Sequence, residues 1–487
     1  MKVKKGSNLF EEARSQGSLS ALCNGRGMCG KCKVKLDVEL PLTPTEVKLL
    51  SVAQIRDNVR LACQHLILEE DVNLTLIDKE NIVVLGLDKG HVDIHKKKSD
   101  LLCAIDLGTT TVVMVLIDGA SGNVLNQHTF TNPQRTYGAD VLSRIEVTLS
   151  NNDSCHRLIR NEVKKTIDDI VDRYQPKSMT IGITGNTTMT HLWLNADVKP
   201  LIQIPYRPSV ADITFQSIRK ELGIDVDGDI TVYPPIGAYL GADILAAIAL
   251  FDLFDTKKNI LFVDLGTNGE IVLACNGQLY ATSTAAGPAF EGVNMSSGCQ
   301  AVDGAIDHFF NDRGELLFTT INEASPVGIC GSGYIDLISC LLEGPLESSG
   351  YMAEEMVFYN NPKVSITQKD IREFQLAKAA IRSGMDMCLH HANISYDQLD
   401  ALMIAGGFGK HINLDAAINI GLIPKQCKEN TVFVGNSSLA GCVSWLTNEK
   451  EIPTKDDISS VKIIDLAGSE QWLQLFTEHM MFEGGNA

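Results

Sequence analysis

Long apolar runs are missing from the sequence, and aromatic residues are few. Aromatic side chains make up 6% of the 487 residues, and only three of them are tryptophans. The longest apolar stretches, Thr111–Ile117 and Ile244–Leu250, are far shorter than the ~20 residues that a membrane-spanning helix needs. The first residues are basic but are not followed by the apolar segment of a secretory signal. We therefore expect a cytoplasmic protein with no membrane partner.

Positive charge is also scarce. The chain contains 42 lysine and arginine residues against 60 aspartate and glutamate residues, which gives a net charge of −18. The imbalance is uneven, because residues 1–100 contain 16 basic and 14 acidic side chains, whereas the remainder contains 26 and 46. An acidic surface repels nucleic acid backbones and anionic lipids. We therefore expect no nucleic acid partner for the larger, C-terminal part.

Cysteine, by contrast, is plentiful, with thirteen residues and no signal for secretion, so a disulfide scaffold is not expected. Cys23, Cys29 and Cys32 have the spacing C-x5-C-x2-C on a glycine-rich segment, and Cys63 follows at a distance. Three thiolates on one loop plus a distant fourth are typical of a [2Fe–2S] cluster, although the plant-type loop is one residue shorter. Four thiolates also satisfy a structural zinc ion, which usually has two C-x2-C pairs rather than one. The other nine cysteines are dispersed and are interpreted as ordinary thiols.

The residues around these cysteines alternate between helical and strand patterns. Asn8–Gln16 is predicted to be a helix with Ser7 as its N-cap, Lys33–Val38 a strand and Thr45–Leu50 a helix. With its cysteines the segment resembles the adrenodoxin-like and plant-like ferredoxins, which implies a β-grasp fold. Those domains begin with a two-stranded hairpin, and only Met1–Lys5 precedes the helix here. We therefore expect the first strand to be absent or shortened.

The tetrapeptide Asp-Leu-Gly-Thr occurs twice, 158 residues apart, and each copy follows an apolar run. The runs Leu101–Ile105 and Asn259–Val263 read as buried strands, and strand patterns resume at Val112–Ile117 and Glu270–Ala274. Each copy is therefore predicted to form the turn of a β-hairpin. A repeat at this distance indicates a duplicated domain with two similar lobes.

The residue types in these turns suit a phosphate group. Glycine lets the backbone approach phosphate oxygens, and backbone N–H and threonine hydroxyl groups donate to them. A carboxylate at the strand end can hold Mg²⁺ through water. A single Asp-Gly turn is also common in ordinary hairpins, so the repetition is what favours two loops that clamp one nucleotide.

Three further segments complete a known order of motifs. Ala401–Ala405 reads as a strand that runs into Gly406-Gly407-Phe408-Gly409, while Gly237–Ala249 and Gly435–Val443 read as helices of small residues that pack closely. With the two hairpins, they resemble the phosphate-1, connect-1, phosphate-2, adenosine and connect-2 motifs of the acetate/sugar kinase, heat-shock chaperone and actin superfamily. This resemblance implies an α/β fold, a two-lobed actin-like ATPase with duplicated RNase-H-like lobes that close on ATP.

The whole chain resembles the reductive activators of corrinoid proteins. Supporting segments are Asn132–Arg144, Gly185–Met189, Thr284–Gly292 and Gly328–Gly333. The resemblance implies a [2Fe–2S] ferredoxin-like domain at residues 1–78, a linker at 79–99, ATPase lobe I at 100–255 and lobe II at 256–487, whose final helices can return to lobe I. The implied reaction passes one electron to Co(II) of a corrinoid protein to regenerate Co(I), driven by ATP. The implied partners are a methyltransferase corrinoid subunit or a corrinoid/iron–sulfur protein, an electron donor such as a reductase or ferredoxin, and a second copy in a homodimer.

The resemblance also assigns roles to individual residues. It implies that Mg²⁺ is oriented by Asp106 and Asp264, and that Asp243 positions the attacking water, although an aspartate at a helix start is equally often structural. Gly287, Phe290 and Glu291 are placed toward the corrinoid partner. The remaining assignments are phosphate contacts by Gly108, Thr109, Thr110, Gly266, Thr267 and Asn268, adenosine contacts by Gly406, Gly407 and Gly409, and cluster ligation by Cys23, Cys29, Cys32 and Cys63.

Other functions share some of these features. One is an ATP-dependent activator of another low-potential enzyme, such as a radical-forming dehydratase, which would hold its cluster inside the ATPase fold. Another is a small-molecule kinase with a regulatory iron–sulfur module, and a third is a redox-sensing protein that binds a partner without catalysis. The separate cysteine-bearing segment favours the corrinoid activator, because a kinase or chaperone has no evident use for a one-electron carrier.

Overall fold

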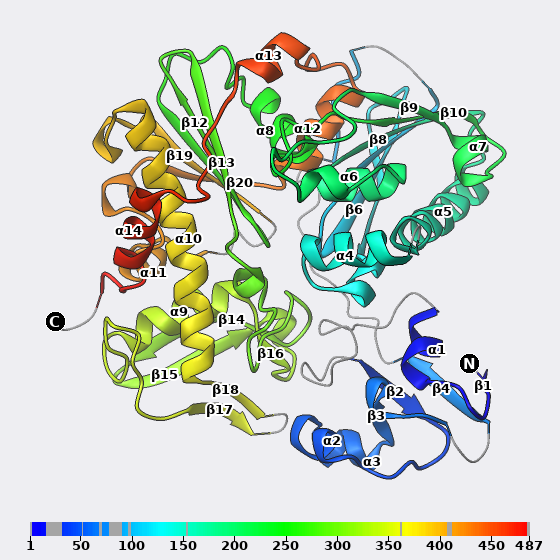
Figure 1. The fold of residues 1–487 in the computed structure, drawn as a ribbon, viewed down its shortest axis with the longest axis vertical. Coiled ribbons are helices and arrows are strands. Elements are labelled where there is room, and N and C mark those ends of the chain that lie inside the picture. The colour runs from blue at the N-terminus through cyan, green and yellow to red at the C-terminus, as the bar shows by residue number, and fades with distance from the viewer. Residues whose placement is uncertain are drawn as a thin grey trace.

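A computed structural model describes residues 2–15, 32–50, 52–67, 71–76, 90–95, 99–151, 154–360, 363–406 and 412–484. Two six-stranded sheets dominate the upper half of the molecule, and a smaller N-terminal unit lies at the lower right of the view (Figure 1). Within these residues, no helix combines the length and apolar character needed to cross a membrane.

Five strands of each large sheet share one topology, and the sixth, β9 or β21, lies at opposite ends of the two sheets. Sheet I has the strand order β7-β6-β5-β8-β10-β9 and sheet II the order β20-β19-β11-β12-β13-β21. In each, the first strand of a hairpin pairs antiparallel with the second and parallel with a later strand, as β5 does with β6 and β8, and β11 with β12 and β19. The repeated tetrapeptide thus marks equivalent positions in two equivalent sheets, as the sequence predicts.

Sheet I consists of strands connected mainly by helices that cover its face. The central strands are buried on both faces and are therefore apolar along almost their whole length. The strands are β5 (Leu101–Leu107), β6 (Thr111–Asp118), β7 (Val124–Thr131), β8 (Ser178–Gly185), β9 (Thr214–Ser217) and β10 (Asp227–Val232). The helices are η2 (Pro133–Tyr137), α4 (Val141–Asn151), α5 (Ser154–Tyr174), α6 (Thr187–Leu194), η3 (Lys199–Leu201), α7 (Ile218–Leu222) and α8 (Ala242–Leu250).

Sheet II is crossed by the long helix α10, whose apolar side chains share one core with strands β11 and β12. Its strands are β11 (Ile260–Leu265), β12 (Gly269–Cys275), β13 (Gln278–Thr284), β19 (Ala401–Ala405), β20 (Thr431–Gly435) and β21 (Lys462–Ile463). The helices that follow or cover it are α10 (Gln368–Ala392), η6 (Tyr396–Gln398), α11 (Leu414–Asn419), η8 (Lys425–Cys427), α12 (Ser437–Leu446), α13 (Lys455–Ser460) and α14 (Glu470–Glu478).

A mixed segment is inserted between β13 and α10 and forms the lower left of Figure 1. It contains a three-stranded sheet of order β15-β14-β16 and a separate hairpin. Its elements are η4 (Pro288–Glu291), β14 (Ala305–Asp312), β15 (Glu315–Thr320), η5 (Ile321–Glu323), β16 (Gly328–Ile329), α9 (Gly331–Leu341), β17 (Met356–Asn360) and β18 (Lys363–Ile366).

Helices α8 and α12 lie between the two large sheets (Figure 1). One side of α8 contributes Leu245 to the core under sheet I, and the other contributes Ile244 to the core under sheet II. The two helices touch closely, since a Cβ atom added at Gly441 of α12 would lie 2.4 Å from the carbonyl oxygen of Ala246 in α8. The predicted close packing of these small-residue helices is therefore confirmed. Helix α8 begins at Ala242, five residues after the predicted start, because Gly237–Leu240 form a turn closed by backbone hydrogen bonds.

The N-terminal unit is a four-stranded antiparallel sheet with short helices. Its strand order is β1-β4-β2-β3. The first strand is present but only two residues long, so it is shortened, as predicted. The predicted helix begins after Asn8, not Ser7, because the Asn8 side chain accepts from the N–H of Phe10 at 2.9 Å. The elements are β1 (Lys2–Val3), α1 (Leu9–Ser15), β2 (Lys33–Leu36), α2 (Pro44–Leu49), α3 (Val52–Arg56), β3 (Val59–Leu61), η1 (Ala62–Gln64) and β4 (Val72–Leu76).

One buried carboxylate ties the parts of the N-terminal unit together. Glu46 is fully buried, and its oxygens accept from the N–H of Thr43 at 2.9 Å and of Leu61 at 2.7 Å. The ring of His65 lies 2.8 Å from the same carboxylate. Burial acts to raise the pKa of Glu46, but the hydrogen bonds from these three residues outweigh it and leave the pKa below its usual value.

We predict that Glu46→Gln lowers the free energy of unfolding by about 2–3 kcal/mol near pH 7, because hydrogen bonds to an ionised acceptor are replaced by weaker ones. A lowered folded-state pKa contributes stability that is present above the unfolded pKa of about 4.3 and is lost as the pH falls through the folded value. The difference from wild type should therefore be constant near neutral pH and begin to shrink as the pH falls below about 4.3. Urea unfolding of the full chain across pH 3.5–7 measures it, with the exposed Glu39→Gln as the matched control. An equal loss in both variants would contradict the prediction.

Candidate functional site

The two repeated turns face each other across one cavity of about 510 Å³. Each turn follows a central strand, so the carboxylate at the strand end and the hydroxyls of the turn enter the cavity from opposite lobes. The structure brings together most of the predicted site residues, namely Asp106, Gly108, Thr109, Thr110, Asp243, Asp264, Gly266, Thr267, Asn268 and Gly406. The predicted residues Gly407 and Gly409, like Cys23 and Cys29, lie outside the described residues.

The lobe I side of the cavity is ordered by side-chain hydrogen bonds. The two carboxylate oxygens of Asp106 accept from Ser438 at 2.8 Å and from Asn436 at 2.9 Å. Asn436 is also the N-cap of α12, so the start of that helix is fixed to the end of β5. On the opposite side of the turn, Asn186, the N-cap of α6, donates to the Thr109 hydroxyl at 2.7 Å.

The lobe II side contains a carboxylate that the sequence analysis did not select. Glu270 is the cross-strand neighbour of Asp264 in the β11–β12 hairpin, and both line the cavity. The sequence does contain a signal for this pair of carboxylates. A three-residue turn at Gly266–Asn268 sets a strand register in which residue 264 faces residue 270. Like charges directly opposite each other destabilise a strand pair, so this pair needs a proton or a cation between the side chains.

Burial raises the pKa of four carboxyl groups in the cavity, and repulsion between acidic neighbours adds to the rise for three of them. Burial, with the charges of Asp243, Asp106 and Glu291, raises the pKa of Asp264 to about 8. Burial also raises the pKa of Asp243 to about 7, although the N–H of Ile244 acts in the opposite direction. The pKa of Glu270 is raised by burial and by its acidic neighbours, and that of Asp106 by burial against its hydrogen bonds. A divalent cation would relieve these charges, and clustered carboxylate oxygens are the ligands that Mg²⁺ prefers.

Two of the three residues that the resemblance placed toward a partner, Phe290 and Glu291, line the cavity. Phe290 is completely buried, and its ring packs edge-on against Phe374 of α10 with centroids 5.1 Å apart. Glu291 lines the cavity between the two turns. The expectation was wrong for Phe290, because the segment folds inward as the short helix η4. For Gly287 and Glu291 the contact with a partner stays a prediction.

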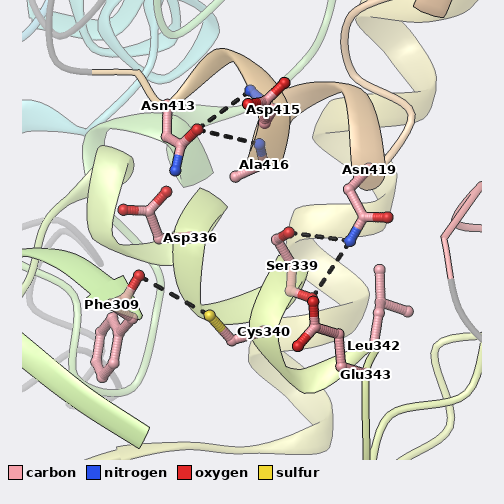
Figure 2. Close-up of a pocket in the computed structure, with 10 residues that line it drawn as sticks. All are labelled: Phe309, Asp336, Ser339, Cys340, Leu342, Glu343, Asn413, Asp415, Ala416 and Asn419. Atoms are coloured by element: carbon pink, nitrogen blue, oxygen red, sulfur yellow. Dashed lines mark hydrogen bonds between the residues drawn. The ribbon is translucent and has the colours of Figure 1, made fainter. Parts of the chain in front are cut away.

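A second cavity, of about 650 Å³, lies between helices α9 and α11 (Figure 2). Its lining includes the carboxylates of Asp336, Glu343 and Asp415. Asp336 is buried and its carboxylate lies 2.8 Å from the ring of His308, while Lys428 pairs with Asp415 at 2.6 Å on the surface. This cavity lacks the backbone and hydroxyl donors of the repeated turns, so it is a poorer candidate for a phosphate group than the cavity between the lobes.

Known proteins resemble most of this chain in sequence. A family model described as the C-terminal domain of RACo, the ASKHA domain, matches residues 258–487, and another described as the RACo middle region matches residues 101–256. The chain is 33% identical over 425 residues to the corrinoid activation enzyme RamQ of Eubacterium limosum, a match that covers 80% of this chain and 71% of the relative. It is 25% identical over 373 residues to the Co(II) methylated amine-specific corrinoid protein reductase of Methanosarcina barkeri, with 69% and 68% covered.

A solved structure resembles the whole chain. The reductive activator for corrinoid, iron-sulfur protein superimposes with a TM-score of 0.72 at 25% identity, covering 99% of this chain and 96% of the other. The mixed α/β fold with an ASKHA, actin-like ATPase domain is therefore shared with that protein.

We predict that Asp264→Asn removes a pH-dependent loss of stability. Below the unfolded pKa near 3.8 the carboxyl group is protonated in both the folded and the unfolded chain, so it does not lower the free energy of unfolding. As the pH rises from there to the folded pKa of about 8, only the unfolded chain loses the proton, and the free energy of unfolding falls. Between pH 6 and pH 8, wild type in a chelator should lose roughly 2–3 kcal/mol relative to the variant, or about 1.4 kcal/mol per pH unit.

Urea unfolding at both pH values measures this loss, and added Mg²⁺ should reduce it in wild type only. Asp255→Asn, at an exposed position, is the matched control. A wild-type-to-variant difference that is the same at pH 6 and pH 8 would show that Asp264 does not titrate in this range.

Proposed function

The chain belongs to the RACo family of corrinoid activation enzymes, and from this premise we propose that it reduces Co(II) of a corrinoid protein to Co(I) in an ATP-dependent reaction. The observation that carries the proposal is the cavity in which two equivalent turns, each with a carboxylate and hydroxyls, face one another. A family of redox activators with an ASKHA ATPase domain has a direct use for such a cavity, namely to convert nucleotide binding into movement of two lobes.

The residues in the cavity fit MgATP. Phosphate oxygens would be held by backbone N–H groups and hydroxyls of the two turns, from Gly108, Thr109, Thr110, Gly266, Thr267 and Asn268. Asp106 and Asp264 would hold Mg²⁺, which neutralises the buried carboxylates whose pKa values are raised. Gly406 would border the adenosine with Gly407 and Gly409. Asp243, at the start of α8 beside Asp106, would orient the attacking water.

The N-terminal unit fits a thiolate-bound cluster. The carbonyl oxygen of Cys32 accepts from the N–H of Ala62, the residue before Cys63, at 2.8 Å. This bond continues the β2–β3 pairing, in which Lys33 faces Leu61, and so brings two of the four candidate ligands to one end of the sheet. Together with Cys23 and Cys29, they would hold a [2Fe–2S] cluster. When bound, such a cluster supplies one electron at a time at a low potential, about −400 mV in plant-type ferredoxins.

An energy source is needed because Co(II) in a corrinoid is reduced only at a lower potential. For one electron, each 59 mV changes the equilibrium constant about tenfold, or ~1.4 kcal/mol. A gap of one to two hundred millivolts therefore amounts to a few kcal/mol, which differential binding of a corrinoid partner to open and closed lobes can supply. The chain's role is to bind the corrinoid protein in a state whose cobalt ligation raises its potential while ATP holds the lobes closed.

Further features of the proposal follow from charge and from family likeness. The first hundred residues have a net charge of +2 and the rest −20, so the two parts of the chain attract each other weakly at low ionic strength. The partners are a corrinoid protein and an electron donor such as a reductase or ferredoxin. A homodimer follows from family likeness alone.

We predict that the purified protein, reduced and supplied with MgATP, converts the Co(II) spectrum of its corrinoid partner to Co(I), and that omission of ATP prevents it. Cys63→Ser should abolish the conversion and the electron paramagnetic resonance signal of the reduced cluster, whereas Cys340→Ser, a half-buried thiol beside β14, should retain both. Visible spectroscopy of candidate corrinoid proteins makes the measurement. An unchanged Co(II) spectrum with every candidate would refute the function, and a silent resonance spectrum with bound zinc would refute the cluster.

A further inference from the structure

Glu291 lies outside the two repeated turns and hydrogen-bonds to both of them. One carboxylate oxygen accepts from the Thr267 hydroxyl of lobe II at 2.9 Å, and the other accepts a short hydrogen bond from the Thr110 hydroxyl of lobe I. The two hydroxyl oxygens are themselves 3.5 Å apart. Both threonines are largely buried, so their hydrogen bonds are made inside the cavity and not in bulk water.

The carboxylate occupies the donors that a phosphate group needs. A threonine hydroxyl has a single proton to donate, so neither Thr110 nor Thr267 can donate to Glu291 and to a phosphate oxygen together. A carboxylate and a phosphate are also both anionic, and their repulsion is strong in a buried site. Phosphate binding at the two turns therefore requires the Glu291 side chain to move away.

The position of Glu291 connects this movement to the rest of lobe II. It ends helix η4, which lies between Gly287 and Gly292, two glycines with positive φ of 75° and 68°. The preceding residue, Phe290, packs against α10, and a Cβ atom added at Gly331, the first residue of α9, would lie 1.8 Å from the Phe290 carbonyl oxygen. Helix η4 therefore has direct contact with the start of α9 and with α10.

We propose that Glu291 is a positioning residue that competes with the terminal phosphate of the nucleotide for the hydroxyls of Thr110 and Thr267, and that its release passes the nucleotide state to η4, α9 and α10. The proposal rests on the proposed nucleotide site. It gives that site a switch, because both lobes are joined through Glu291 in one state and through the phosphate in the other.

The test is Glu291→Gln in the full chain, with calorimetric titration by MgATP. The amide is neutral and a weaker acceptor, so the threonine hydroxyls give it up more easily to a phosphate oxygen. We expect about tenfold tighter binding of MgATP, which corresponds to the free energy of about one charge-assisted hydrogen bond. Glu315→Gln, exposed on β15, is the control and should bind as wild type does. Glu291→Asp serves as a second variant, because its shorter side chain cannot span both threonines and should also bind more tightly.

Hydrogen exchange gives an independent measurement. Replacement of a residue with a purely structural role would not change how this measurement responds to MgATP. In wild type, MgATP should change the exchange of backbone amides in residues 289–292 and at the start of α9. In Glu291→Gln these amides should already exchange as in the nucleotide-bound wild type, and MgATP should change them little.

Three outcomes would overturn the proposal. The first is an equal or weaker affinity for MgATP in both variants when their melting temperatures match wild type. The second is unchanged affinity with loss of ATP hydrolysis in Glu291→Gln, which would make Glu291 a catalytic base. The third is a wild type that binds no nucleotide, which overturns the proposed function as well, whereas the first two leave that function intact.

Discussion

The organisation of the molecule depends on the repulsion between carboxylates that the fold buries at one place. Asp106 and Asp264 end equivalent strands of two sheets, Asp243 begins a helix between them, and Glu270 faces Asp264 across a hairpin. Keeping such charges together costs several kcal/mol per ion unless they are protonated, hydrogen-bonded or bound to a cation. The hydrogen bonds to Asp106 and the proposed Mg²⁺ are two answers to the same constraint, whereas Glu291 adds a further negative charge. We expect a cavity of this kind to accept a metal–phosphate complex more readily than an uncompensated anion.

The sequence predicted the parts of this arrangement that follow from local patterns. The apolar runs of Leu101–Ile105 and Ala401–Ala405 are strands because a run of that length, bounded by glycine and aspartate, has few alternatives. Repetition of the Asp-Leu-Gly-Thr turn was enough to predict two equivalent hairpins. The resemblance to corrinoid activators is also confirmed by the comparisons, since it rested on several motifs in a fixed order rather than on one.

What escaped prediction depends on contacts between segments that are far apart in the chain. Glu291 lies in the cavity only because η4 packs on α9 and α10, and nothing in its own sequence neighbourhood indicates this. Likewise, Asn436 is a helix cap by local pattern, whereas its hydrogen bond to Asp106 spans 330 residues. At the N-terminus, Asn8 and Ser7 are both good caps, and the register of the adjoining strand decides between them. Roles of this kind are properties of the assembled core.

The chemistry of the thiols has a consequence for how the protein matures. Burial raises the pKa of seven described cysteines in the ATPase part, to about 12 for Cys442 and about 11 for Cys340 and Cys427; the others are Cys103, Cys275, Cys330 and Cys388. A thiol reacts with metals and oxidants as the thiolate, so these seven are nearly inert at neutral pH. Iron delivered to the folded chain for the proposed [2Fe–2S] cluster would therefore meet little competition from these seven thiols. If the ATPase part folds before the proposed cluster is inserted, its buried thiols would not bind the metal in place of the proposed ligands.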